Sequence, residues 1–163
     1  MKKKALITFV IILVASLVSS LEIESKGNYS TSETLLLSIK GNFLEPIKKE
    51  SISFYEGRTE LSLIYDITKI DNTYYLYAQL KSAPKNYTLR IENAHFLENS
   101  AEKIENIELN FTAKEPGADF SVSPGFIITK DQFSLNINAF KTTSINSLFG
   151  NQSAQYKLSP GQT

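Results

Sequence analysis

His95 is the single histidine of this chain, and it stands in the sequence Asn-Ala-His-Phe-Leu-Glu-Asn. A histidine that serves as general base in a hydrolase needs a nucleophile beside one ring nitrogen and an orienting acid beside the other. The chain contains no Gly-x-Ser-x-Gly, the sequence that exposes a serine nucleophile on a sharp turn. We therefore expect His95 to be structural or exposed, which makes a secreted hydrolase the least favoured function.

Acidic side chains gather at two places in the sequence. Asp66 and Asp71 bracket a predicted turn, and Glu102, Glu105 and Glu108 follow one another at intervals of three. Calcium takes six or more converging oxygen ligands, and the alternating aspartates of a calcium loop do not occur. With no cysteine, no His-Glu-x-x-His and only 7 glycines, thiolate sites, zinc hydrolysis and phosphate-binding loops are not predicted. We expect no catalytic residue, no metal and no cofactor, and we interpret these carboxylates as solvated charges.

Two tyrosines could bind a ligand by stacking. Tyr75 and Tyr77 share one face of a predicted strand in Thr73–Lys81, opposite the apolar residues of that run. An exposed aromatic pair can stack on a sugar ring, so a carbohydrate- or ligand-binding module is one interpretation. Tyrosine is also a common solvent-facing residue of strands, and this second interpretation is favoured.

Four asparagines stand in Asn-x-Ser/Thr sequences, which accept N-linked glycans in hosts that make them. They are Asn28, Asn86, Asn110 and Asn151. A chain rich in asparagine, serine and threonine also produces such triplets by chance, and Asn86 and Asn110 adjoin predicted core strands. Glycosylation and chance are therefore the two explanations of the pattern.

The elements that must position these residues are strands. In Thr34–Phe43, Leu35, Leu37 and Ile39 point one way and the residues between them point the other, which is the pattern of a half-buried strand. Six further runs between Leu21 and Lys114 alternate in the same way. Their inward-facing residues are Leu21 and Ile23; Ile52 and Phe54; Leu61, Leu63 and Tyr65; Tyr74, Leu76, Ala78 and Leu80; Tyr87, Leu89 and Ile91; and Ile107, Leu109 and Phe111.

Short polar segments separate the runs. Glu56–Thr59 and Ile70–Thr73 are predicted as tight turns. Asn99–Ile107 is predicted to form at most one helical turn, because Asn99 can cap it and Glu102 stands three residues later. A series of about seven short strands without crossover helices indicates an all-β, antiparallel β-sandwich.

The stretch Tyr87-Thr-Leu-Arg-Ile opens a late strand after Pro84-Lys85-Asn86. It resembles the penultimate strand of immunoglobulin-like (Ig-like) and fibronectin type III-like modules, where a tyrosine two residues before a core position caps a corner with its hydroxyl. The resemblance covers residues 21–114 and implies Ig-like sandwich material of the kind found in prokaryotic envelope proteins, archaeal ones in particular. It implies that Tyr87 is the structural corner tyrosine. The chain lacks tryptophan and cysteine, which sets it apart from antibody-type domains.

The N-terminus carries a targeting pattern. Lys2–Lys4 precede a nearly unbroken apolar run, Ala5–Val18, which is shorter than the roughly 20 residues that a spanning helix needs. It suits the apolar helix of a secretory signal cleaved near Ser19 and Ser20, with a retained anchor as the alternative. Cleavage after Ser20 leaves 14 basic and 17 acidic residues, a net charge of −3. Nucleic-acid binding is therefore not expected, and membrane association is expected only through an uncleaved N-terminal segment.

A second strand pattern begins after Glu115–Gly117. At an offset of 98 residues, Leu35, Leu37, Ile39 and Gly41 align with Phe133, Leu135, Ile137 and Ala139. We divide the chain into a signal peptide at 1–20, an Ig-like sandwich at 21–115 and a partial second β-module at 116–163. The last part is small for an independent core. It is expected to continue beyond this sequence, to pack on the first module, or to be completed by a partner strand.

These observations predict an exported protein, secreted or at the cell surface, with a structural, spacer or adhesive Ig-like module and no catalysis. Other surface proteins or glycans are the expected partners, and the functional part rests on fold-level analogy. A carbohydrate-binding module that uses Tyr75 and Tyr77 is one alternative. A pilin-like filament subunit is another, because Lys3-Lys4-Ala5-Leu6-Ile7 is similar to the processing site of archaeal pilin precursors.

Overall fold

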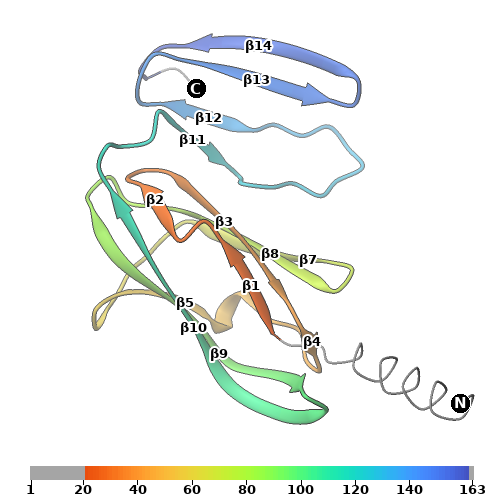
Figure 1. Ribbon diagram of the computed structural model, residues 1–163. Coiled ribbons are helices and arrows are strands. Elements are labelled where there is room, and N and C mark those ends of the chain that lie inside the picture. The colour runs from red at the N-terminus through yellow and green to blue at the C-terminus, as the bar shows by residue number, and fades with distance from the viewer. Residues whose placement is uncertain (1–20, 162–163) are drawn as a thin grey trace, which may run out of the picture.

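The computed structural model describes residues 21–161, and within this range the chain is all-β with predominantly antiparallel pairing (Figure 1). A 3₁₀ turn, η1 (Lys49–Ser51), is the one helical element of the described residues. Two larger sheets lie against each other in the lower part of Figure 1, and two two-stranded sheets lie above them. The apolar N-terminal run, predicted as a signal helix, lies outside the described residues.

The first large sheet has the strand order β1-β3-β8-β7 and is antiparallel throughout. Its strands are β1 (Glu22–Ser25), β3 (Thr34–Lys40), β7 (Tyr65–Ile70) and β8 (Thr73–Gln79). The register places Leu35 opposite Ala78, Leu37 opposite Leu76 and Ile39 opposite Tyr74. Directly opposed apolar side chains stabilise a strand pair, so this register gives the sheet one continuous apolar face.

The second large sheet has the order β2-β10-β9-β5-β6, and β4 also pairs with β9. Its strands are β2 (Asn28–Ser30), β4 (Asn42–Phe43), β5 (Ile52–Glu56), β6 (Thr59–Glu60), β9 (Lys85–Glu98) and β10 (Ala101–Lys114). β2 runs parallel to β10, which departs from the purely antiparallel arrangement that the sequence predicts. The chain passes from the first sheet to the second at Gly27, whose φ of 75° suits glycine.

The core lies between these two sheets and is built from the side chains that the alternation predicts to point inward. Leu35, Ile39, Leu76 and Ala78 of the first sheet are 0% exposed, and Phe54, Tyr87, Leu89 and Ile91 of the second are 1% exposed. Leu21, Ile23, Leu61, Tyr65 and Leu109 are partly buried at its margin. Apolar burial stabilises a fold by about 25 cal/mol per Å², so this shared interior is the main source of stability in a chain without disulfides.

The connections confirm two predicted turns and correct one predicted helix. Glu56 pairs with Thr59 and Ile70 with Thr73, so both turns are tight hairpin connections. The helical turn predicted at Asn99–Ile107 is wrong, because β10 begins at Ala101 and continues through this stretch. Asn99 and Ser100 have φ values of 52° and 63°, the left-handed values of a type I′ hairpin turn. Pairing with β9 therefore overrides the local capping signal.

The predicted strand at Thr59–Asp66 is also divided. β6 ends at Glu60 in the second sheet, whereas β7 begins at Tyr65 in the first. The residues between them carry the chain from one layer to the other, and Leu63 stays buried on the way. One alternating pattern therefore serves two strands in different sheets.

The last described part of the chain forms two hairpin-like pairs. β11 (Phe120–Ser123) pairs with β12 (Asn136–Ala139), and β13 (Thr143–Phe149) pairs with β14 (Gln152–Leu158). The predicted alternation from Phe133 to Ala139 holds only in its second half. Phe133 and Leu135 precede β12 and are 50% and 44% exposed. Ala139 is the one buried hydrophobic residue described in 116–161, so this part has little interior of its own.

Candidate functional site

The outward face of the β1-β3-β8-β7 sheet carries the two tyrosines that the sequence singles out. Tyr75 is 40% exposed, but Tyr77 is only 7% exposed. The ring of Phe126 packs edge-on against Tyr77, with ring centroids 5.2 Å apart at an interplanar angle of 87°. The same burial raises the pKa of the Tyr77 hydroxyl. The expectation of an exposed pair is therefore wrong for Tyr77, and Tyr75 is the ring available for stacking.

Residues 116–126, which follow β10, cover part of this face. The Thr34 hydroxyl donates to the Val122 carbonyl oxygen at 2.9 Å and lies 3.0 Å from the Val122 nitrogen, whose N–H it accepts. Gly125 approaches the sheet so closely that a Cβ there would lie 2.5 Å from Cβ of Tyr77. Glycine is the residue that permits such an approach. This contact could not be predicted, because no local pattern in the sequence links Gly125 to Tyr77.

A hollow of about 510 Å³ opens beside Tyr75, and we call it the Tyr75 hollow. Its lining includes Leu36, Ile70, Tyr75 and Phe126, with Glu24 and Ser38 as polar members. Ser38 lies directly opposite Tyr75 in the sheet register, and its hydroxyl donates to Oε2 of Glu24 at 3.2 Å. An exposed ring beside a hydroxyl and a carboxylate suits a sugar, because the ring contacts C–H groups while the polar atoms bind hydroxyls.

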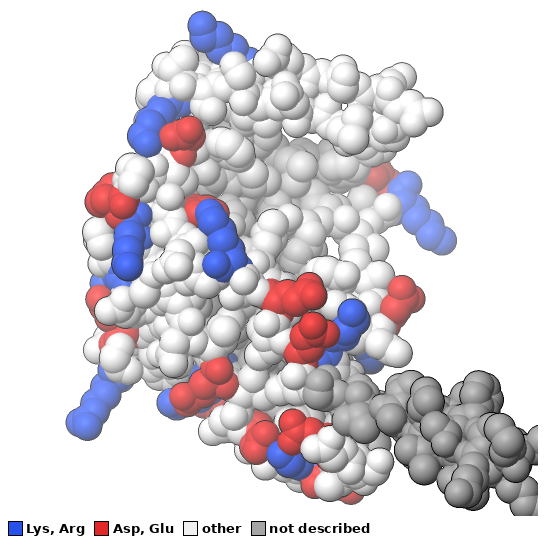
Figure 2. Space-filling view, in the orientation of Figure 1, with Lys and Arg blue, Asp and Glu red and all other residues white. Residues whose placement is uncertain are grey.

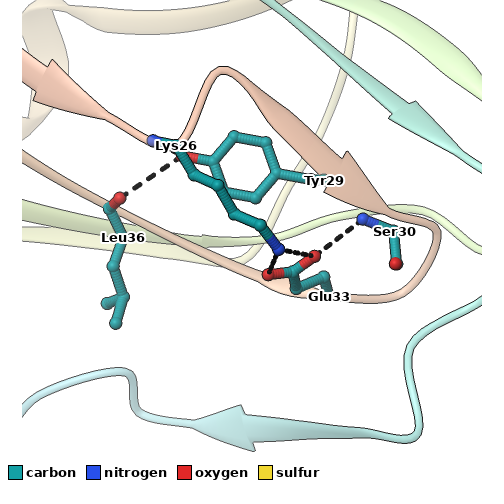
Figure 3. Close-up of polar contacts among 5 residues, drawn as sticks. All are labelled: Lys26, Tyr29, Ser30, Glu33 and Leu36. Atoms are coloured by element: carbon teal, nitrogen blue, oxygen red, sulfur yellow. Dashed lines mark hydrogen bonds and ion pairs between the residues drawn. The ribbon is translucent and has the colours of Figure 1, made fainter.

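A second hollow, of about 530 Å³, lies between the first module and residues 116–122. On one wall, Nζ of Lys26 binds the two carboxylate oxygens of Glu33 at 2.8 and 3.1 Å, and Glu33 also accepts the N–H of Ser30 at 2.7 Å (Figure 3). On the other wall, Lys141 binds Asp119 at 3.1 Å. These four charges are satisfied within the protein, so the Tyr75 hollow is the candidate site of the two.

His95 is held between two glutamates. Its Nδ1 lies 3.2 Å from Oε1 of Glu45, and its Nε2 lies 2.6 Å from Oε1 of Glu102. The hydrogen bonds to Glu45 and Glu102 raise the pKa of His95, because they favour the imidazolium form. In that form both ring nitrogens donate and neither can accept a proton. His95 thereby links the segment after β4 and the strand β10 to β9.

The predicted solvated carboxylates are dispersed. Asp66 pairs with Lys49 at 3.3 Å and Glu108 with Arg90 at 2.9 Å, while Asp71 lies in the β7–β8 turn with a φ of 54°. Within the described residues, no group of three or more histidine, aspartate or glutamate side chains is placed to hold a metal ion. Asp66 and Glu108 therefore form separate surface ion pairs, and Glu102 binds His95.

Tyr87 lies at the start of β9 with its ring 1% exposed. Its hydroxyl accepts the backbone N–H of Lys81, six residues upstream, at 3.0 Å. Its ring stacks on that of Phe111, with centroids 5.0 Å apart at 5°. The bond to Lys81 is the contact that a corner tyrosine makes with the preceding connection.

The four asparagines of the Asn-x-Ser/Thr sequences divide into two groups. Asn28, Asn86 and Asn110 are exposed on neighbouring strands of the second sheet, and Asn151 is exposed in the β13–β14 turn. That three of them share one patch is not among the sequence-based predictions. The sequence does distinguish these three from Asn151, because each has an aromatic residue between the asparagine and the hydroxyl residue.

The surface and the comparisons add little to this picture. On the face shown in Figure 2, charged side chains of both signs are spread over the two-sheet part, and the upper part is mainly uncharged. No helix of the described residues is both long and apolar enough to cross a bilayer.

No family model, no curated protein and no solved structure matches this chain.

Proposed function

We propose that this chain is an exported cell-surface protein whose first module is an Ig-like β-sandwich with a structural, spacer or adhesive role and no catalytic activity. The observation that carries the proposal is the strand order. With β1, β3, β5, β7, β8, β9 and β10 lettered A to G in chain order, the two sheets read A-B-E-D and G-F-C. This is the order of immunoglobulin-like sandwiches.

The corner tyrosine gives independent support. In this lettering Tyr87 begins strand F, and its hydroxyl binds the backbone of Lys81 in the E–F connection. A tyrosine at this place, bonded to the backbone upstream, is a hallmark of Ig-like sandwiches. The role as spacer or adhesive module follows from the class of fold, since function is otherwise argued from a site.

The export part of the proposal is tested by the mature N-terminus. Cells that make the protein are fractionated, and the intact mass and N-terminal sequence of the purified chain are determined. A chain that starts at or near Leu21 in the envelope or medium supports export by cleavage. A chain that starts at Leu6 within filaments supports the pilin-like alternative. A chain that retains Met1 and stays inside the cell contradicts export.

The structural or adhesive part is tested by removing the module. Cells that express the gene without residues 21–115 should attach less well to surfaces or to one another, or should show a weakened envelope. The wild-type gene supplied in trans should restore both properties. Unchanged attachment and unchanged envelope strength would contradict this role.

The Tyr75 hollow favours a second candidate function, the binding of a carbohydrate. The exposed ring of Tyr75 would stack on the sugar, while Ser38 and Glu24 would bind its hydroxyls. Isothermal titration with a panel of soluble oligosaccharides measures this binding. Tyr75→Ala should abolish the heat of any sugar that binds, whereas Tyr156→Ala, at an exposed tyrosine of β14, should leave it unchanged. No heat across the panel, or equal heat from both variants, removes the candidate.

A further inference from the structure

Three of the four Asn-x-Ser/Thr sequences lie side by side on the outer face of the second sheet. Asn28-Tyr29-Ser30 forms β2, Asn86-Tyr87-Thr88 lies at the start of β9, and Asn110-Phe111-Thr112 lies near the end of β10. The order of these strands is β2-β10-β9, so each sequence adjoins the next. All three have the same composition, an asparagine and a hydroxyl residue that flank an aromatic residue.

The aromatic residues fix the direction of the polar ones. Tyr29, Tyr87 and Phe111 are 6%, 1% and 3% exposed. Phe111 contacts both tyrosines, with ring centroids 5.6 Å from Tyr29 and 5.0 Å from Tyr87. Successive residues of a strand point to opposite faces, so this buried cluster holds each asparagine and each hydroxyl residue on the outer face.

The strand register brings the three asparagines into one patch. Thr112 of β10 is the register partner of both Asn28 of β2 and Asn86 of β9, and Asn110 pairs with Thr88. Adjacent strands are about 4.8 Å apart, which puts the backbones of Asn28 and Asn86 about 10 Å from each other with Asn110 on the strand between. A hollow of about 490 Å³ at this face is lined by all three asparagines.

Hydrogen bonds across the strands orient two of the amides. The Thr88 hydroxyl donates to Oδ1 of Asn110 at 2.7 Å, and the Thr112 hydroxyl donates to Oδ1 of Asn28 at 2.9 Å. Each hydroxyl therefore binds the asparagine of a neighbouring sequence. Both bonds use the amide oxygen, and within the described residues the amide nitrogens of Asn28 and Asn110 have no hydrogen-bond partner. The nitrogen is the atom that an N-linked glycan requires.

Strand preference does not account for these asparagines. Asparagine is depleted in strands, whereas threonine is favoured there. An exposed strand position would ordinarily carry a β-branched or charged residue. Strand preference alone therefore does not explain three asparagines at such positions, each followed two residues later by serine or threonine.

We propose that Asn28, Asn86 and Asn110 are acceptors of N-linked glycans that together cover the outer face of β2, β10 and β9. The co-substrate is a lipid-linked oligosaccharide. A bond forms between Nδ2 of the asparagine and the anomeric carbon of the sugar, and the bond from that carbon to a phosphate oxygen of the lipid breaks. The lipid phosphate leaves with the electron pair of that bond, and the proton lost from Nδ2 passes to water. The inference rests on the proposed export. Glycans on this face leave the opposite sheet, with the Tyr75 hollow, as the uncovered side of the module.

Peptide mapping by mass spectrometry of the full chain, purified from the cells that make it, tests the proposal. Peptides that contain Asn28, Asn86 and Asn110 should each carry added saccharide mass. Unmodified peptides at these three positions overturn the proposal, including the case in which Asn151 alone is modified. Fractionation of the same cells separates the two failures: an exported but unmodified chain refutes only the glycans, and a chain retained inside refutes export as well.

Paired variants distinguish an acceptor sequence from a purely structural hydrogen bond. Thr88→Ala removes the hydroxyl that Asn86 requires, and Thr88→Ser keeps it. The alanine variant should lose the mass of one glycan, and the serine variant should keep the wild-type mass. Thr112→Ala and Thr112→Ser should behave in the same way for Asn110. Equal masses within each pair would overturn the proposal.

Discussion

At the scale of single residues, His95 makes stability depend on pH. Its pKa is raised in the folded protein by the hydrogen bonds to Glu45 and Glu102, so the proton on His95 stabilises the fold. This contribution is complete below the pKa of a histidine in the unfolded chain, about 6.5, and is lost as the pH rises through the higher pKa of the folded state. We expect His95→Gln to destabilise most below about pH 6.5 and progressively less as the pH rises through the raised pKa of His95 in the folded state.

Urea titrations of wild type and His95→Gln across this range measure the difference in the free energy of unfolding. Glu105→Gln serves as control, because Glu105 lies on the same strand but does not contact the imidazole in the described structure. A difference between wild type and His95→Gln that stays constant over the range would contradict a role for the proton.

Tyr87 provides a second prediction at this scale. Tyr87→Phe keeps the stacked ring but removes the hydroxyl that accepts the N–H of Lys81. A part-buried donor that loses its partner costs about 1–3 kcal/mol, and we expect a loss of this size in the free energy of unfolding. Tyr156→Phe, at a tyrosine that is 54% exposed, should change it by less than about 0.5 kcal/mol. Equal effects in guanidinium titrations would contradict the corner assignment.

Residue roles that depend on nearby sequence could be predicted, and those that depend on distant segments could not. The resemblance around Tyr87 predicted its corner role but not its partner, and that partner, Lys81, lies in the connection just before the strand of Tyr87. Tyr77 has the alternation of an exposed residue, but Phe126 comes from a later segment and buries it. The glutamates that bind His95 also come from other elements, which no spacing in the sequence reveals.

At the scale of elements, the β9–β10 hairpin turn is open to improvement. Ser100 has a φ of 63°, a left-handed value that is strained for a residue with a Cβ. Ser100→Gly should therefore stabilise the protein by up to about 1 kcal/mol, because relief of the left-handed strain, roughly 1–2 kcal/mol, exceeds the extra entropy that glycine loses on folding, about 0.5–1 kcal/mol. The turn then reads Asn-Gly, the preferred type I′ sequence. Ser100→Ala keeps the strain and should bring no gain. Thermal unfolding of both variants checks this, and a less stable glycine variant would refute the turn type.

The docking of residues 116–126 gives a second prediction about elements. Gly125→Ala places a methyl group 2.5 Å from Cβ of Tyr77, so the segment must move away from the sheet. We expect faster hydrogen exchange at the Val122 amide and easier proteolysis between Gly117 and Phe126, while the strands of the first module keep their protection. Lys130→Ala, an exposed change in the same connection, is the matched control. Wild-type exchange at Val122 in Gly125→Ala would contradict this account.

Strands with a clear alternating pattern could be predicted. The elements that could not were the very short strands and the long strand β10, which runs through the predicted helical turn. β3, β5 and β8 follow directly from period-two patterns whose inward residues are buried. β2 and β4 are too short to show a pattern. The sequence at Asn99 has the capping signal of a helix, but the pairing of the two fourteen-residue strands β9 and β10 outweighs one local cap.

At the scale of the whole molecule, stability should reside between the two large sheets. Leu76 is 0% exposed at the centre of this core, and Leu148 in β13 is 77% exposed. Leu76→Ala should cost about 2–5 kcal/mol of unfolding free energy through lost burial and a cavity. Leu148→Ala should change it by less than about 0.5 kcal/mol. Circular dichroism during urea unfolding measures both, and similar losses would contradict a single dominant core.

The shared interior could be foreseen because one buried face per strand requires a second layer to cover it. The arrangement of β11 to β14 could not, since these strands bury little and their position depends on a few contacts such as Thr34 with Val122. The Tyr75 hollow was foreseen only through its tyrosine. Its other walls come from β1, β3, the end of β7 and the segment around Phe126.

The parallel pairing of β2 with β10 has a mechanical consequence. The chain enters β2 and leaves β10 at opposite ends of this pair, because the two strands run in the same direction. A stretching force applied through the two flanks of the module would therefore slide the strands past each other, loading their hydrogen bonds simultaneously in shear instead of unzipping them singly. A protein that tethers a cell against flow or traction would gain resistance to unfolding from this arrangement.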